Sequence, residues 1–166
     1  MNKKLKILCN NIKLVITDVD GVLTDGGMYY SKSGDSLKKF FTRDGMGVTL
    51  LKKSGIPTII ITKEKNQIIK QWAKKMNITK LYDGILKKED LLEEICIAQK
   101  ILPNQIAYIG DDVNDIELLK KVGLSVTPND GIIDAKKICD YICVKNGGNG
   151  AFRELADLIL SSKKQS

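Results

Sequence analysis

Two aspartates separated by one residue, Asp18 and Asp20, directly follow the short apolar run Leu14–Thr17. Such a run is typical of a buried strand, and an unpaired carboxylate is very costly to bury. The two charges therefore need a neutralising partner, which could be a metal ion, a lysine or a set of backbone amides. The pair is the first candidate for a polar site at the end of a strand.

Polar side chains also follow three other apolar runs. A threonine ends the run 57–62, two lysines come shortly after the KLYDG segment, and the acidic motif DDVND follows the run 106–110. The residues concerned are Thr62, Lys87, Lys88, Asp111, Asp112 and Asp115. Because the carboxyl ends of parallel strands meet at the same edge of a sheet, we expect these side chains to converge there with the first two aspartates.

Two acidic groups at one edge repel each other unless a cation lies between them, and oxygen ligands favour Mg²⁺. A Mg²⁺ site combined with a lysine and a threonine hydroxyl suits a phosphate group, because all three stabilise phosphoryl oxygens. One aspartate could then attack phosphorus and form an aspartyl-phosphate. The aspartate two residues further on could protonate the leaving oxygen and later deprotonate a water molecule.

Each of these features also has a plain structural interpretation. The aspartate pair could serve a turn, the DDVND motif and Thr62 could cap helices, and Lys88 could be a solvated helix residue. Their occurrence in order, each at the end of a predicted strand, favours a functional site.

The absence of histidine removes several kinds of catalysis. With no histidine, the chain cannot use Ser-His-Asp or Cys-His catalysis, histidine metal ligands or imidazole acid–base chemistry. The four cysteines form no C-x-x-C pair, so we expect buried free thiols rather than a zinc site. Carboxylates and lysines must therefore carry any catalysis.

The composition fits one domain with a hydrophobic core, since 43% of the 166 residues are hydrophobic. The net charge is +7, with lysines spread along the chain and few aromatics, so we expect a solvated surface that favours a small anionic substrate over nucleic acid. No apolar run approaches the ~20 residues that span a bilayer, and the N-terminus lacks a signal-like apolar core. We therefore expect a cytoplasmic protein with no membrane partner.

Apolar runs alternate with amphipathic segments, which predicts the elements that must position the site. Strands are expected at Leu14–Thr17, 57–62, 80–84, 106–110, 124–128 and 141–144. Helices are expected at 44–55, with Asp44 as the cap, and at 64–76, 88–101, 112–121 and 150–160. A hairpin is expected within 28–41, with its turn at Ser33, Gly34 and Asp35, and a polar tail at 161–166. Strands that alternate with helices imply an α/β fold with a parallel sheet and helices on both faces.

The segments ITDVDGVLTDGG and YIGDDVND, together with Thr62 and Lys88, resemble the four motifs of the haloacid dehalogenase superfamily of phosphatases. More narrowly, the segments DGVLTDGGMYY, TRDGMGVTLLKKSGI and GGNGAFRE are similar to its capless branch. That branch dephosphorylates 3-deoxy-ulosonic sugar acids: 3-deoxy-D-manno-octulosonate (KDO) 8-phosphate, or the nine-carbon KDN and sialate 9-phosphates. The resemblance covers roughly 12–160.

The resemblance implies a Rossmann-like, doubly wound parallel sheet without a cap domain. Residues 1–166 would form a single domain with a small hairpin insertion at about 25–42. No cap fits between Asp20 and Thr62, yet the site must exclude water. In relatives the hairpins build a tetramer, so the resemblance implies a homotetramer in which a neighbouring subunit covers the site.

The resemblance also implies roles for individual residues. Asp18 would be the nucleophile and Asp20 the general acid and base. Mg²⁺ would be held by Asp18, the backbone carbonyl of Asp20, and Asp111. Thr62 and Lys88 would bind the phosphate of the small sugar-acid substrate, with Lys88 also orienting Asp18.

Supporting roles are implied for further residues. Asp112 and Asp115 would support the metal ligands, and Lys87 could share the role of its neighbour Lys88. Arg153 could pair with a substrate carboxylate; its alternative is a surface ion pair with Asp157, four residues on.

The segment after Thr62 departs from the family pattern. Many KDO 8-phosphate phosphatases have Gly-Arg there, whereas this chain has Lys63-Glu64, which looks more like the nine-carbon branch. We expect Glu64 to accept a hydrogen bond from a sugar hydroxyl and to favour a nine-carbon 9-phosphate. The alternative is that Glu64 only caps the following helix.

Two other classes of protein share parts of this pattern. A phospho-receiver switch also uses a parallel sheet with aspartates and a lysine, but the strand ending at Thr62 offers no acceptor aspartate. A catalytically inactive oligomerisation module, related to the C-terminal portion of CMP-sialate synthase, is the second alternative. The presence of Asp18, Asp20, Lys88 and Asp111 favours an active enzyme.

Overall fold

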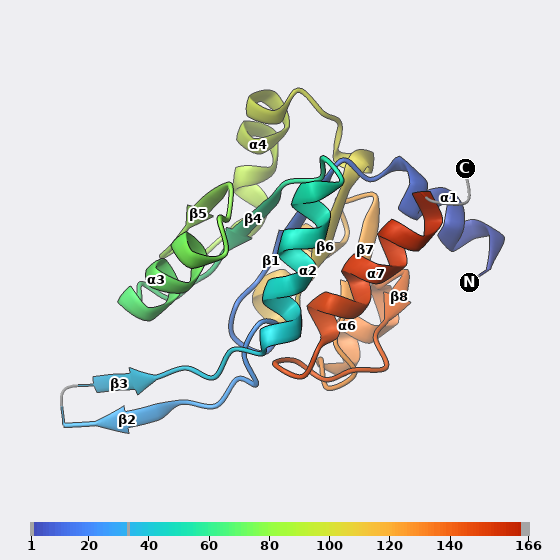
Figure 1. Ribbon diagram of the computed structural model, residues 1–166. Helices are drawn as coiled ribbons and strands as arrows, with labels where there is room; N and C mark the ends of the chain where they lie inside the picture. Colours follow the sequence, from blue (N-terminus) through green and yellow to red (C-terminus); the bar gives the residue numbers. More distant parts are fainter. Residues whose placement is uncertain (1, 33, 164–166) are drawn as a thin grey trace.

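A six-stranded parallel sheet forms the centre of the molecule, with the strand order β5-β4-β1-β6-β7-β8 (Figure 1). The computed structural model describes residues 2–32 and 34–163. The strands are β1 (Leu14–Thr17), β4 (Thr58–Ile61), β5 (Lys80–Tyr82), β6 (Ile106–Ile109), β7 (Leu124–Thr127) and β8 (Tyr141–Ile142). Each lies within an apolar run that the sequence predicts to be a strand.

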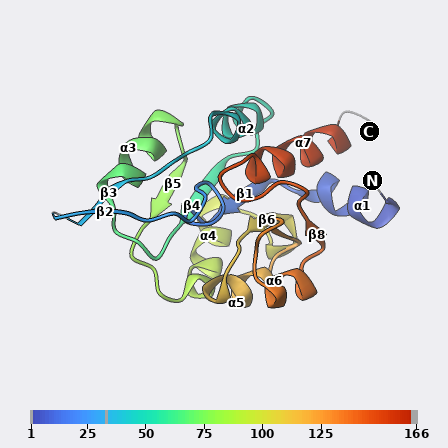
Figure 2. The ribbon, with the colours of Figure 1, turned by 90° about the horizontal axis from the view of Figure 1, so that it is seen from below.

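Helices cover both faces of the sheet (Figure 2). On one face lie α1 (Lys3–Asn11), α2 (Thr42–Lys53), α3 (Gln67–Lys75) and α7 (Ala151–Lys163). On the other lie α4 (Leu92–Gln99), α5 (Ile116–Leu119) and α6 (Ile133–Ile138). The predicted α/β, doubly wound fold is therefore confirmed.

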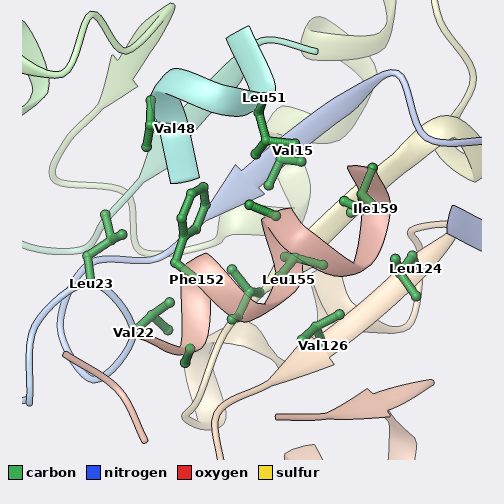
Figure 3. Close-up of a cluster of buried hydrophobic side chains, with 14 of the residues drawn as sticks. Val15, Val22, Leu23, Val48, Leu51, Leu124, Val126, Phe152, Leu155 and Ile159 are labelled. Atoms are coloured by element: carbon green, nitrogen blue, oxygen red, sulfur yellow. The ribbon is translucent and has the colours of Figure 1, made fainter. Parts of the chain in front are cut away.

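Two hydrophobic cores follow from the alternation of side chains along the strands. In β1, Val15 joins one core, whereas Leu14 and Ile16 point into the other. Figure 3 shows the first core, where Phe152 and Leu155 of α7 pack beside Val15. Full burial of each such side chain contributes roughly 1.5–3 kcal/mol to the stability of the fold. The packed sheet therefore holds the loops at its edge in fixed positions.

The order of the strands fixes where the site forms. From β1 the chain winds through β4 and β5 to one edge, then returns to β6 and winds through β7 and β8 to the other. The direction reverses between β1 and β6, and ligands of such sheets bind at the carboxyl ends of the strands beside this reversal. Asp18 follows β1 and Asp111 follows β6 closely, so the fold brings the two predicted acidic groups to this edge of the sheet.

A two-stranded hairpin, β2 (Tyr29–Ser31) and β3 (Gly34–Leu37), projects from the domain (Figure 1). An isolated bridge between Thr24 and Phe40 joins its two legs at the base. The Phe40 ring also stacks on Trp72 of α3, with 4.7 Å between the ring centroids. The structure confirms the predicted hairpin, although Ser33 of the predicted turn lies outside the described residues.

Two predicted helix starts are wrong. Helix α3 begins at Gln67, because the side chain of Asn66 caps it by accepting from the Ile68 amide at 2.8 Å. Glu64 therefore does not cap this helix. Asp44 does not cap α2 but lies buried inside its first turn, where it accepts from the Arg153 amide at 2.8 Å. It thus ties α2 to the start of α7.

Other boundaries also differ from the prediction. The segments expected to start helices at 88 and 112 begin as 3₁₀ turns, η1 (Lys88–Leu91) and η3 (Val113–Asp115), and a third turn is η2 (Pro103–Gln105). Helices α1 and α6 are not predicted at all. The expected polar tail is wrong for 161–163, which continue α7 with Ser162 buried, and 164–166 lie outside the described residues. Along the described chain, no helix has both the length and the apolar character of a membrane span.

Candidate active site

Four residues form a buried cluster at this edge of the sheet: Asp18, Lys88, Tyr108 and Asp115. The ammonium group of Lys88 lies 2.8 Å from Asp18 Oδ1 and 2.6 Å from Asp115 Oδ1. The hydroxyl of Tyr108 donates to the same oxygen of Asp115. The side chains of Lys88 and Asp115 are both fully buried, so the ion pairs are shielded from water and salt.

Asp115 is the hub of this cluster. Its Oδ2 accepts from the backbone amides of Asp111 at 2.9 Å and Asp112 at 3.2 Å. A side chain at Gly110 would place Cβ only 2.6 Å from Asp115, so this glycine lets the carboxylate turn back under the loop. Because both its oxygens are engaged, Asp115 orients its neighbours and is poorly placed to attack a substrate.

Burial and neighbouring charges set the protonation of the cluster. Burial raises the pKa of Asp18 to about 7, although Lys88 opposes this rise. For Lys88, burial lowers the pKa, but the two carboxylates, Asp18 first, outweigh it and the net pKa is raised. The lysine therefore stays charged and favours the ionised, nucleophilic form of Asp18.

Asp111 completes a group of carboxylates that could hold a metal ion. One oxygen from each of Asp18, Asp111 and Asp115 lies within 4.8 Å of the others. Asp111 Oδ1 is buried and accepts no hydrogen bond from the described residues. Burial, followed by the charge of Asp18, raises the pKa of Asp111 to about 8. An unpartnered, buried carboxylate oxygen among other carboxylates fits a hard divalent cation such as Mg²⁺.

Gly21 makes room for Asp111. Its φ of +86° lies in the left-handed region, and a Cβ there would lie 2.0 Å from Asp111 Oδ2. A residue with a side chain would therefore both strain the loop after β1 and push Asp111 away. Gly21, directly after Asp20, is thus required for Asp111 to lie where it does in the acidic group.

Asp20 belongs to a second arrangement at the mouth of the site, the hairpin edge, which comprises Asp20, Thr24 and Lys38. Lys38 Nζ lies 2.8 Å from Asp20 Oδ1, and the Thr24 hydroxyl donates to the same oxygen at 3.2 Å. The second oxygen, Oδ2, is buried and accepts no hydrogen bond from the described part of the chain. The sequence predicts Asp20 but not its two partners.

The remaining predicted phosphate ligands lie at the ends of β4 and β5. Thr62 is buried directly after β4, and its hydroxyl accepts from the Glu64 amide at 3.2 Å. Lys87 is exposed whereas Lys88 is buried, so Lys88 alone reaches Asp18. Asp112 is exposed and accepts from the Val113 amide at 2.7 Å, which makes it a cap for η3.

The two residues expected to recognise the sugar lie further out. Glu64 is exposed in the loop between β4 and α3. Arg153 Nε donates to both carboxylate oxygens of Asp157 at 2.9 Å, which is the alternative ion pair. Arg153 also lines a surface pocket of about 510 Å³, together with Arg43, Lys145, Glu154 and Asp157, so charges of both signs line the pocket.

Tyr108, Thr24 and Lys38 contact the candidate site residues but are not predicted from the sequence. Tyr108 is the one aromatic residue in an aliphatic strand segment, IAYI, and that contrast is a usable signal. Thr24 and Lys38 carry no comparable signal, because one lies in a turn and the other in a lysine-rich segment.

A sequence model of the family described as haloacid dehalogenase-like hydrolase matches residues 52–155. The 3-deoxy-D-manno-octulosonate 8-phosphate phosphatase of Haemophilus influenzae is 36% identical over 166 residues, which is 100% of this chain and 90% of that protein. The chain belongs to the haloacid dehalogenase-like hydrolases. Its resemblance to this family is thus confirmed.

Other relatives carry the same name. The corresponding phosphatase of Escherichia coli (strain K12) is 42% identical over 154 residues, covering 90% of this chain and 80% of that protein. The crystal structure of the Moraxella catarrhalis phosphatase, in complex with magnesium ion, phosphate ion and a KDO molecule, matches with a TM-score of 0.95 and 33% identity. The structural match covers 99% of this chain and 95% of the Moraxella catarrhalis chain.

These findings confirm the prediction of an enzyme that hydrolyses phosphoric monoesters. They also support Mg²⁺ as the cofactor, because a relative with the same fold binds magnesium and this chain groups Asp18, Asp111 and Asp115 closely. The comparisons assign no role to any single residue of this chain.

Proposed function

We propose that this protein is a Mg²⁺-dependent phosphatase that hydrolyses KDO 8-phosphate through an aspartyl-phosphate on Asp18. The observation that carries the proposal is the pairing of Asp18 with buried Lys88, 2.8 Å apart, beside Asp111 at the reversal of the sheet. The names and the bound ligands of the relatives support the choice of substrate.

Asp18 is the nucleophile in this proposal. Its carboxylate attacks phosphorus, the bond from phosphorus to the sugar oxygen breaks, and an acyl phosphate forms on Asp18. Lys88 holds the side chain in position, and its charge stabilises the negative charge that crowds the site. Lys88 Nζ is also held by Asp115 Oδ1 at 2.6 Å. The Asp18 carboxylate is therefore oriented before substrate binds.

Asp20 transfers the protons. It gives a proton to the sugar oxygen as that oxygen leaves, and later takes a proton from the water that attacks the acyl phosphate. That second attack releases inorganic phosphate and regenerates the Asp18 carboxylate. Asp20 Oδ2, which accepts no hydrogen bond from the described residues, is the atom available for both transfers.

The phosphate group binds through three features of the chain. The Thr62 hydroxyl accepts from the Glu64 amide, so its own hydrogen remains to donate to a phosphoryl oxygen. Lys88 supplies a positive charge. Asp18 and Asp111, with the backbone carbonyl of Asp20, would hold Mg²⁺, which when bound neutralises the charge on the phosphoryl oxygens.

A nine-carbon sugar 9-phosphate is the second candidate substrate, and the exposed Glu64 favours it. Since Asn66 caps α3, Glu64 has no capping role and its carboxylate is available to a sugar hydroxyl. Arg153 would take the substrate carboxylate, in exchange for part of its pairing with Asp157.

We also propose that the chain is a homotetramer in which a neighbouring subunit covers the site. The hairpin exposes four large apolar side chains, which are Met28, Tyr29, Tyr30 and Leu37. An element that projects with such side chains is typical of an interface between subunits. Sedimentation near four times 18.4 kDa is expected, whereas a fully active monomer would contradict this part of the proposal.

The function is tested by phosphate release from a panel of sugar phosphates with six, eight and nine carbons. We expect the highest kcat/KM on a 3-deoxy-ulosonic acid phosphate, loss of activity in EDTA and recovery with Mg²⁺. A preference for neutral six-carbon sugars would contradict the substrate class, and activity after exhaustive chelation would contradict the metal. No release from any substrate would instead indicate the inactive oligomerisation module.

A further inference from the structure

We infer that Lys38 is a positioning residue for proton transfer, which fixes one oxygen of Asp20 and so directs the other toward the leaving group. The inference rests on the proposed role of Asp20 as general acid and base. It assigns a task to a residue of the hairpin, an element outside the four sequence motifs of the site.

The contacts divide the two oxygens of Asp20. Lys38 Nζ at 2.8 Å and the Thr24 hydroxyl at 3.2 Å both engage Oδ1. Among the described residues no group donates to the buried Oδ2. A carboxylate with one oxygen held from two directions cannot rotate freely, so the direction of Oδ2 is fixed as well.

The burial of Lys38 distinguishes this pair from a surface ion pair. The Lys38 side chain is 2% exposed, although Asp20 is 29% exposed at the mouth of the site. Ordering and burying a lysine side chain costs up to ~2 kcal/mol of rotamer freedom. The next residue, Lys39, is 52% exposed and lies 3.2 Å from Asp25, which is an ordinary surface pair of small energetic value.

The hairpin base explains how Lys38 is placed. Lys38 directly follows β3, and two residues later Phe40 is bridged to Thr24 and stacked on Trp72. The same short segment thus contacts the loop that carries Asp20 and a helix of the main domain. The lysine is anchored close to its carboxylate even though the tip of the hairpin projects away.

If Lys38 positions the general acid, the effect of losing it should depend on the basicity of the leaving group. A basic leaving oxygen requires a proton as it departs, whereas p-nitrophenolate leaves readily without one. A displacement of a catalytic group by about 1 Å can cost ~100-fold in rate. Loss of Lys38 should therefore slow esters with basic leaving groups and spare p-nitrophenyl phosphate.

The test compares kcat/KM on phenyl phosphate and p-nitrophenyl phosphate, two substrates of similar size that differ in the basicity of the leaving oxygen. For Lys38→Met we expect a loss of ~30-fold or more on phenyl phosphate and less than ~3-fold on p-nitrophenyl phosphate. Lys38→Arg should restore most of the loss, since it keeps a charged donor. Lys39→Met is the matched control and should behave like the wild type on both substrates.

Equal losses on the two substrates, or no loss, would overturn the inference, since a purely structural or phosphate-binding role predicts no dependence on the leaving group. Asp20→Asn separates this outcome from failure of the proposed function. If Asp20→Asn discriminates between the two esters and Lys38→Met does not, only the role of Lys38 is wrong; if neither does, Asp20 is not the acid. Should Lys38→Met fail to fold, Lys38→Gln is read by the same ratio.

Discussion

The buried cluster around Asp18 and the hairpin edge around Asp20 lie two residues apart in the chain but are held by different parts of the fold. Asp18 is held from inside the domain, by a lysine that is fully buried and by Asp115, which closes the network. Asp20 is held from outside the sheet, by Lys38 of the hairpin, and remains 29% exposed.

The difference follows from what each group must do. A nucleophile that forms a covalent bond needs a fixed position and little competition from water, and a buried ion-pair network supplies both. An acid and base must exchange protons with the leaving group and with water, and the Asp20 side chain is accordingly partly exposed. Its orientation depends on the hairpin, the element that we propose for subunit contact.

The largest effect is expected for the nucleophile. Asp18→Asn replaces the attacking carboxylate with an amide and removes a metal ligand, so kcat should fall by at least ~10³-fold, about 4 kcal/mol. Steady-state phosphate release measures this. Retention of more than about a tenth of wild-type activity would remove Asp18 from its role.

Asp20→Asn should also be nearly inactive toward sugar phosphates, but for a different reason. Its backbone carbonyl remains, so Mg²⁺ should still bind, and calorimetry with Mg²⁺ alone measures this. A variant that no longer binds the ion would contradict the separation of the two arrangements.

The two lysines should differ in their effect on stability. Lys88→Met leaves buried carboxylates without their counter-ion and should lower the free energy of unfolding by about 3–5 kcal/mol. Lys38→Met removes the ion pair with a partly exposed carboxylate and should cost less, about 1.5–3 kcal/mol. Urea denaturation of both variants measures the difference, and similar values for the two would show that the arrangements are not distinct.

The pH dependence of stability should reflect the buried carboxylates. Folding raises the pKa of Asp18 to about 7 and that of Asp111 to about 8, against about 3.9 in the unfolded chain. The folded state therefore binds protons more tightly, and the stability this provides is lost as pH rises through 7 and 8. In EDTA the melting temperature should fall between about pH 5.5 and 8.5, and Mg²⁺ should restore more of it at the higher pH. A flat profile in EDTA would contradict the raised pKa values.

The smallest effect is expected for Glu64, which is exposed in the loop between β4 and α3. Glu64→Ala should lower kcat/KM for a nine-carbon 9-phosphate by ~10-fold, about 1.4 kcal/mol, because a hydrogen bond to a sugar hydroxyl is lost. The variant should act on p-nitrophenyl phosphate like the wild type. Equal losses on both substrates would assign Glu64 no part in recognition, whereas a wild-type preference for KDO 8-phosphate would rule out only the nine-carbon candidate.

The sequence predicts most of the buried cluster around Asp18, because its charged residues follow predicted strands. The apolar run Leu14–Thr17 is observed as β1 with the same bounds, and strand ends place Asp18, Asp111 and Lys88 at one edge. Their convergence follows from the rule that parallel strands expose their carboxyl ends together. The acidic group at this edge of the sheet could therefore be predicted from the sequence.

The partners of Asp20 at the hairpin edge could not be predicted in the same way. Lys38 and Lys39 are adjacent and chemically identical, and only the twist and anchoring of the hairpin decide which one turns inward. Asp44 is similar: its position near a helix start indicated a cap for α2, but tertiary contact makes it a partner of Arg153. Helix α1 has only nine residues, KKLKILCNN, and is too short to offer a long periodic pattern.

The division of work between Asp18 and Asp20 is tested most directly by mixing the Asp20→Asn variant rapidly with p-nitrophenyl phosphate. This leaving group needs no acid, so Asp18 should still be phosphorylated, while the missing base should slow hydrolysis of the acyl phosphate. We expect a burst of roughly one equivalent of p-nitrophenolate per subunit, and a phosphoryl group on the peptide that contains Asp18 after acid quenching. Absence of both, or a phosphoryl group on another residue, would contradict the account.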